Sequence, residues 1–255
     1  MPIIPAGAIV AFLAVAFVIA AIWIGIRMAR ESGEQAEARK AADAEIARRA
    51  NAKGRRFEKI SDIARSREHR PMPAGVVTLR EYNPLPQSDA IWKQQGSAAG
   101  NIDWTLVWAV SYKASPFTAT NEPTVYMRDV IQGQRLEWRC PALKHDGLAF
   151  SFYRRHGDDT KPDEIRIEPE GTLWRRWRLE ARDEALARRV FNPALCALLD
   201  KLPTPRASNT LIDERTSIML DANGLQAILG VDDLTPDLVD LWIAVGEQLA
   251  AEAKA

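Results

Sequence analysis

Cys140 and His145 stand five positions apart in the segment CPALKH, and a cysteine near a histidine is a pair that can perform nucleophilic chemistry. The imidazole takes the thiol proton and leaves a reactive thiolate. Closeness in sequence does not by itself bring two side chains together, and the surroundings of Cys140 and Cys196 are apolar, which is typical of buried thiols. We therefore interpret both cysteines as core residues and His145 as part of a turn.

A second cluster, RRHGDD, gathers His156, Asp158 and Asp159 around one glycine. Carboxylates and an imidazole can bind a cation, but a calcium loop needs more oxygen ligands at fixed spacing. We interpret this segment as a solvated hairpin loop and predict no metal site. The chain also lacks a phosphate-binding glycine-rich loop, a nucleophile elbow, an HExxH motif and paired CxxC motifs. We therefore assign no catalytic residue and expect no cofactor.

The segment LWRRWRLEAR alternates tryptophan with arginine. On a strand, Trp174, Arg176 and Arg178 lie on one face, and their neighbours in the chain lie on the other. Arginine packs on tryptophan with a gain of about 0.5–2 kcal/mol, so a solvated sheet face explains the pattern. Because tryptophan and arginine are also favoured anchors of protein interfaces, the alternative is a binding surface. Trp174, Arg176 and Arg178 are our candidate binding residues.

The elements that would position these residues are mostly strands. In IDWTLVWAVSYK every second residue from Ile102 to Tyr112 is apolar, which predicts a long half-buried strand. Further strands are predicted at 76–80, 124–131, 135–139, 148–154, 164–168, 172–180 and 216–220. Because the connections between them are short and rich in turn residues, we expect antiparallel pairing.

Helices come after the last aromatic-basic strand. Asp183 is a suitable N-cap for a short helix, Asn192 for a second one with Pro193 at its first position, and Thr235 for a C-terminal helix from Pro236 to about Ala253. Strands followed by a helix pair, a strand and a helix indicate an α+β domain, with helices packed on an antiparallel sheet.

The stretch from the strand WRRWRLEARD through EALARRVF to NPALCALLDKL resembles a family of uncharacterised bacterial membrane-anchored proteins, a domain of unknown function. The match covers mainly residues 172–202, with a looser match toward the end of the chain. Asn192 departs from the threonine usual at that place, although both residues can cap a helix. The resemblance implies the location and the fold and brings no site residues.

The N-terminal segment predicts that location independently. Residues 3–26 are 24 uncharged and mostly apolar residues, which as a helix rise about 36 Å, enough to cross a hydrocarbon core about 30 Å thick. Arg27 and Arg30 come directly after it, and no basic residue precedes the segment. The positive-inside rule then keeps the C-terminal part in the cytoplasm. We expect a single-pass protein of the bacterial inner, or plasma, membrane.

Charge divides the rest of the chain. Residues 27–70 hold 13 basic and 8 acidic residues, a net charge of +5, whereas residues 71–255 hold 21 and 26, a net charge of −5. The basic segment suits anionic lipid headgroups, and the acidic remainder argues against nucleic acid as a partner. We predict a transmembrane anchor over 1–27, a charged helical stalk over 28–70, broken near Gly54, and an α+β domain over 71–255.

These patterns favour a membrane-anchored protein whose domain binds a partner protein, or a second copy of itself, without catalysis. One alternative is a membrane-tethered enzyme with a dispersed site that uses His145, His156 and neighbouring acids. A third is a component of the envelope or of a secretion complex.

Overall fold

The structure is a computed structural model that describes residues 33–34, 36–62, 70–71, 87–98, 101–118, 125–154, 164–165, 177–203 and 216–254. The chain divides into two compact units, Met1–Ala47 and Arg48–Ala255. The predicted transmembrane segment lies outside the described residues, and no helix among those residues is long and apolar enough to cross a membrane.

Part of the segment that we predicted as a helical stalk is helical. In the first unit residues 36–47 are helical, and Lys40 Nζ lies 2.8 Å from Glu37 Oε1 on the exposed side. In the second unit residues 48–52 are helical and the helix ends before Gly54, whose φ of 68° is readily adopted only by glycine. The predicted break near Gly54 is therefore confirmed.

The segment after Gly54 is a strand and not the helix that we expected. A helical stalk that continued to residue 70 would place Phe57, Ile60, Ile63 and Ala64 along one side of a helix. Instead β1 (Arg56–Lys59) pairs antiparallel with β3 (Gln87–Ala98), and the Phe57 ring lies 5.7 Å from that of Trp92. Ile60 is 48% exposed, and Ile63 and Ala64 lie outside the described residues. Residues 48–59, which we placed in the stalk, thus belong to the second compact unit.

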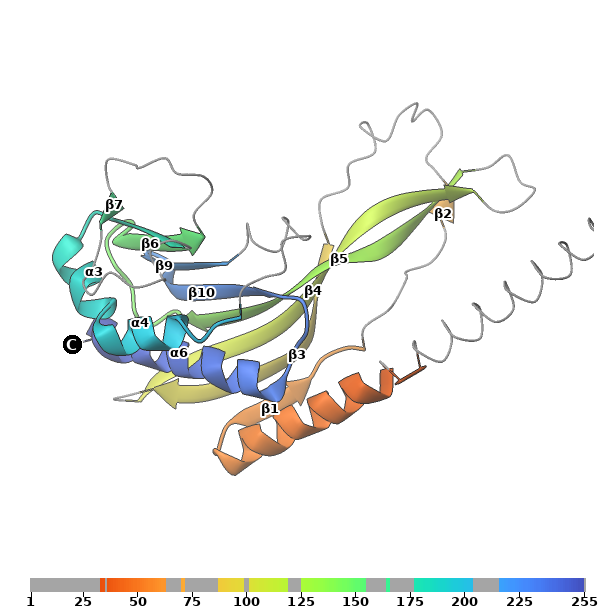
Figure 1. Ribbon diagram of the computed structural model, residues 1–255, viewed down its shortest axis with the longest axis horizontal. Helices are drawn as coiled ribbons and strands as arrows, with labels where there is room; N and C mark the ends of the chain where they lie inside the picture. The colour runs from red at the N-terminus through yellow and green to blue at the C-terminus, as the bar shows by residue number, and fades with distance from the viewer. Residues whose placement is uncertain are drawn as a thin grey trace, which may run out of the picture. The chain divides into compact units, whose positions relative to one another are not determined.

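A ten-stranded antiparallel sheet forms the second unit, with the order β1-β3-β4-β5-β10-β9-β6-β8-β7 and β2 paired to β5 (Figure 1). The remaining strands are β2 (Arg70–Pro71), β4 (Ile102–Thr118), β5 (Val125–Cys140), β6 (Phe150–Arg154), β7 (Glu164–Ile165), β8 (Trp177–Ala181), β9 (Ser217–Asp221) and β10 (Gly224–Val231). The predicted α+β class and antiparallel pairing are confirmed. The β9–β10 hairpin joins β5 to β6, two strands that are not bonded to each other.

The long alternating strand is confirmed as β4. Its predicted apolar face is buried throughout, with at most 8% exposure, at Ile102, Trp104, Leu106, Trp108, Val110 and Tyr112. A β-bulge lies at Ser111/Tyr112, where the register with β5 shifts, and another lies between Ala90 and Trp92 on β3. Past the first bulge β4 and β5 continue side by side, and β2 pairs with β5 at Tyr126 and Met127 in this extension (Figure 1).

In the described part of the chain, one face of the sheet is covered by α3 (Glu184–Val190), α4 (Pro193–Leu199) and α6 (Pro236–Lys254) (Figure 1). The predicted caps are present. Asp183 and Asn192 accept hydrogen bonds from the backbone N–H groups of Leu186 and Leu195, at 2.9 and 3.0 Å, and Thr235 accepts from Leu238 at 3.2 Å. Short polar side chains thereby satisfy N–H groups that the first turn of a helix leaves unbonded.

The core lies between these helices and the sheet. One row of side chains crosses six neighbouring strands in register and is at most 1% exposed: Leu106, Trp138, Ala227, Ile218, Phe152 and Leu179. Phe191, at the end of α3, packs on this layer with its ring 4.9 Å from that of Phe152. On α6, Gly246 approaches Trp138 so closely that an added Cβ would lie 2.4 Å from the indole ring.

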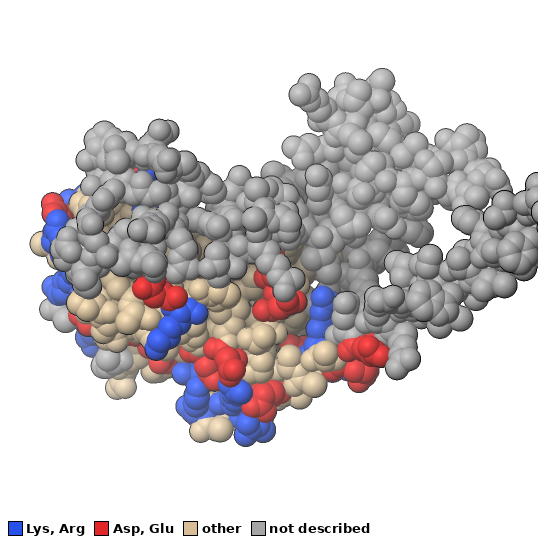
Figure 2. Space-filling view, in the orientation of Figure 1, with Lys and Arg blue, Asp and Glu red and all other residues tan. Residues whose placement is uncertain are grey.

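Charged side chains hold residues 49–55, the end of the N-terminal helix and the turn after it, against α6. Asp240 accepts hydrogen bonds from Lys53 at 2.6 Å and from Arg49 at 3.3 Å, and Arg55 lies within 3.5 Å of Asp240 and Glu247. Burial alone would raise the pKa of Asp240, but these hydrogen bonds and the charges of Lys53 and Arg55 outweigh it and hold that pKa below its ordinary value. On the face drawn in Figure 2, acidic and basic side chains intermingle.

Candidate functional site

Two regions are candidates for the functional site: the predicted aromatic-basic strand and a pocket beside α3. Of the predicted binding residues, Trp174 and Arg176 lie outside the described residues. Arg178 lies on β8 and is only 4% exposed, so the structure gives it little surface to offer to a partner. The prediction that Trp174, Arg176 and Arg178 form a binding surface stays a prediction.

The strand pairing fixes the direction of each side chain on β8. Leu179 pairs with Phe152 in the core row, and the Trp177 ring stacks on that of Phe152 at 5.1 Å. Because side chains alternate along a strand, Arg178 and Glu180 point to the opposite face of the sheet, on which the described part of the chain places no helix. Arg178 pairs there with Tyr153, whose hydroxyl donates a hydrogen bond to Glu180.

We call the sheet surface opposite α3, α4 and α6 the helix-free face, and two rows of side chains in register define it. The first is Val107, Glu137, Ile228, Ser217, Tyr153 and Arg178; the second is Thr105, Arg139, Gln226, Met219, Ser151 and Glu180. Except for Glu137 and Arg178, these side chains are half-buried or exposed. The face therefore mixes polar groups with partly exposed Met219, Ile228 and Val107.

A short chain of charges runs along β5 on this face. Glu137, whose side chain is 8% exposed, accepts hydrogen bonds from Arg135 Nε and, at 2.6 Å, from Arg139 Nη2. The Arg139 side chain is 57% exposed. A nearly buried carboxylate is thus neutralised by two arginines, one of which reaches the solvent. This arrangement keeps Arg139 oriented outward.

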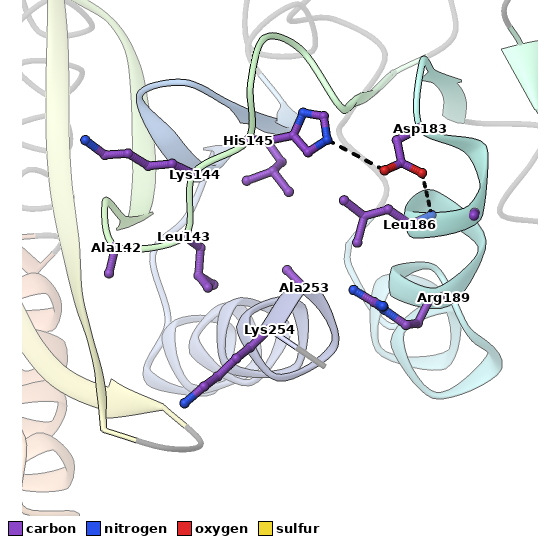
Figure 3. Close-up of a pocket in the computed structure, with 11 residues that line it drawn as sticks. Ala142, Leu143, Lys144, His145, Asp183, Leu186, Arg189, Ala253 and Lys254 are labelled. Atoms are coloured by element: carbon purple, nitrogen blue, oxygen red, sulfur yellow. Dashed lines mark hydrogen bonds and ion pairs between the residues drawn. The ribbon is translucent and has the colours of Figure 1, made fainter.

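The pocket lies between the loop 141–149, α3 and the end of α6, and has a volume of about 470 Å³ (Figure 3). Its apolar lining comes from Leu143, Leu186 and Leu220, with three alanines. Its charged lining is Lys144, His145, Asp183, Arg189 and Lys254. This volume falls in the usual range for small-molecule sites.

His145 and Asp183 face each other on one side of the pocket (Figure 3), with 3.6 Å between His145 Nε2 and Asp183 Oδ2. The other oxygen of Asp183 caps α3, and the backbone N–H of His145 donates to Asp221 O at 3.0 Å. His145 Nδ1 is buried and has no hydrogen-bond partner among the described residues. The pair thus connects the loop to α3, and its second imidazole nitrogen is turned away from solvent.

Arg189 is held at the end of α6, where its Nε donates to Glu252 O at 3.0 Å. This bond satisfies one of the last carbonyls of the helix and fixes the guanidinium plane. In Figure 3 Arg189 lies beside Leu186 toward the pocket, whereas the side chains of Lys144 and Lys254 extend away from it and end in their ammonium groups. Three permanent positive charges thus surround a lining with one carboxylate, Asp183.

We interpreted both cysteines as core residues, and the structure buries only Cys140. Cys140 is fully buried on β5, and burial raises the pKa of its thiol. Cys196 on α4 is half-buried and donates to Phe191 O at 3.4 Å, and burial raises its pKa to about 11. Since a thiolate is the reactive form, neither cysteine is activated as a nucleophile. The core interpretation of Cys140 is confirmed.

Within the described ranges, no three His, Cys, Asp or Glu side chains are grouped to hold a metal ion. His156, Asp158 and Asp159 lie outside those ranges.

The chain matches no protein-family model. Comparison with curated proteins and with solved structures gives no significant match either.

Sequence reasoning identified His145 and Asp183 separately but did not bring them together. Asp183 was explained fully as a helix cap and His145 as part of a turn. Their proximity depends on β6 and β8 pairing side by side, which places the loop before β6 next to the helix after β8. Nothing in the local pattern of either segment signals that pairing.

Proposed function

We propose that this chain is a single-pass membrane-anchored protein whose α+β domain binds a partner protein at the cytoplasmic face of the membrane. The uncharged segment 3–26 and the arginines after it support the anchor and its orientation. The binding role is non-catalytic.

One observation carries the binding role: the composition of the helix-free face. Methionine, tyrosine and arginine are enriched at protein interfaces, and Met219, Tyr153 and Arg139 share this face. Among the described residues, α3, α4 and α6 cover the opposite face of the sheet and no helix covers the helix-free face, which supports the helix-free face as the surface for a partner. Trp174 and Arg176, if their strand continues the alternation of β8, add two anchors to it.

Site-specific photo-crosslinking in the full-length protein tests this role. A photoreactive amino acid at Met219 should give a discrete heavier product in cells. The control places the same amino acid at Ile60, which is 48% exposed and lies beyond β1 at one edge of the sheet. Equal products from both positions, or none from Met219, would refute the assignment of the face.

Co-purification in mild detergent tests the same face by substitution. Met219→Glu and the double variant Trp174→Ala/Arg176→Ala should lose a near-stoichiometric partner, and Ile60→Glu should keep it. A reporter that is active only outside the cell, fused after Ala255, should stay inactive. Activity of that reporter would instead favour the envelope or secretion-complex alternative.

A second candidate function is a membrane-tethered enzyme centred on His145. The observation that favours it is the pocket, in which an imidazole and a carboxylate meet beside an arginine. His145→Gln separates the two candidates. Loss of cellular function with unchanged folding and unchanged partner capture would favour the enzyme.

A further inference from the structure

The charges and the apolar lining of the pocket point to a ligand with two parts. Leucines and alanines provide a surface for an apolar chain. Lys144, Arg189 and Lys254 add three positive charges around this surface. The negative groups beside it are the Asp183 carboxylate and the C-terminal end of α6. A helix C-terminus carries the equivalent of roughly −0.5 charge, so the positive charges still outnumber the negative ones.

Arg189 is the group best placed to recognise an anion. Its Nε is already committed to Glu252 O, and this bond holds the guanidinium in one plane. The two terminal nitrogens donate no hydrogen bond to another described residue, so a pair of parallel donors remains available. A planar guanidinium with two such donors matches the two oxygens of a carboxylate.

We propose that the pocket binds an organic carboxylate with a short apolar chain. The carboxylate pairs with Arg189, and the chain lies against Leu143, Leu186 and Leu220. Lys144 attracts the anion without a fixed contact. This site is separate from the helix-free face, so it can be present or absent whatever the outcome for the partner protein.

Binding is measured by calorimetric titration of the full-length protein in lipid nanodiscs, with empty nanodiscs as the blank. The probes are hexanoate, hexanamide, inorganic phosphate and the peptide N-acetyl-alanyl-leucine. Hexanoate and the peptide both offer a carboxylate next to an apolar group. The probe that binds with the higher affinity shows whether the site takes the carboxylate of a small acid or that of a polypeptide C-terminus. Hexanamide keeps the chain without the charge, and phosphate keeps the charge without the chain.

We expect saturable binding of at least one carboxylate and weaker binding of both controls. Arg189→Gln should weaken it about tenfold, equivalent to about 1.4 kcal/mol. Arg188→Gln is the matched control, since Arg188 is the preceding residue of α3 and pairs with Glu184 outside the pocket lining. The Arg188→Gln variant should bind the carboxylate with the same affinity as the wild type.

Arg189→Gln also removes the hydrogen bond to Glu252 O on α6 and can therefore destabilise the fold. A second variant that leaves the packing unchanged is measured beside it. Lys144→Glu lies on an exposed loop and should weaken binding about threefold through its charge alone. The proposal is overturned if neither carboxylate binds, if hexanamide binds as tightly as hexanoate, or if phosphate binds more tightly than both. It is also overturned if the folded variants Arg189→Gln and Lys144→Glu bind like the wild type.

Discussion

Gly246→Ala tests how closely α6 packs on the sheet. The added Cβ would lie 2.4–2.5 Å from three atoms of the Trp138 indole, whereas ordinary contacts are 3.4–4 Å. Trp138 is fully buried and packs against Trp104 with 6.2 Å between ring centroids, so it has little room to retreat. Either the indole or the helix must therefore move by about 1 Å.

Two opposing effects set the size of the change. Overpacking a core costs about 1–3 kcal/mol, and this contact is short enough to belong at the upper end. In the opposite direction, alanine stabilises a helix by about 1 kcal/mol relative to glycine. The net loss in the free energy of unfolding is then about 2 kcal/mol, which for a domain of this size lowers Tm by about 4–8 °C.

The assay is thermal unfolding of the full-length protein, followed by circular dichroism. A double-mutant cycle with Trp138→Phe is the control, because the smaller ring makes room for the methyl group. Gly246→Ala should lower the free energy of unfolding less in the Trp138→Phe variant than in the wild type. An unchanged or higher Tm for Gly246→Ala would show that helix propensity dominates and that α6 does not pack as closely as described.

Two further predictions concern a cap and an ion pair. Asn192→Ala removes the N-cap of α4 and should lower the free energy of unfolding by about 1 kcal/mol. Asn192→Thr keeps a capping side chain, so its free energy of unfolding should stay within about 0.5 kcal/mol of the wild type. Urea titration measures both values, and equal losses for the two variants would refute the capping role. Asp240→Asn should cost about 1 kcal/mol at pH 7, since the carboxylate is partly exposed. Because the pKa of Asp240 is lower in the folded protein than the ordinary value of about 3.9, its contribution is present above that pH and is lost as the pH falls through the folded pKa. The difference between wild type and Asp240→Asn should therefore shrink below about pH 4, and a constant difference would contradict the ion pairs.

The sequence predicted those elements whose signal is local. The alternation from Ile102 to Tyr112 survives because one side of β4 is buried along its whole length. Asn192 and Pro193 mark the start of α4 whatever surrounds it, because capping depends only on neighbouring backbone groups.

The missed elements have patterns that only their partners explain. β3 reads QSDAIWKQQGSA, a polar segment whose Gln94 is buried beside Leu106, so its hydrophobicity gave no strand signal. β10 reads GLQAILGV, which lacks a clean period because its position between β5 and β9 buries most of it. Phe57 was assigned to a helix because a four-residue strand is too short to show its period.

The candidate site shows the same limit. Trp174, Arg176 and Arg178 were chosen by residue type, and the burial of Arg178 could not be seen before β6 and β8 were paired. The pocket is lined by segments that meet only in the folded chain: the loop before β6, α3, β9 and the end of α6. No single stretch of sequence therefore predicts it.

The position of the β9–β10 hairpin has a consequence during synthesis of the chain on the ribosome. Strands β1 to β5 can form one half-sheet and β6 to β8 another, but residues 217–231 must emerge before the two halves can join. Until then β5 and β6 each present an edge whose backbone groups lack a strand partner, and such edges invite pairing with other chains. A nascent chain stalled before Gly224 should therefore depend on chaperones more than the finished protein does.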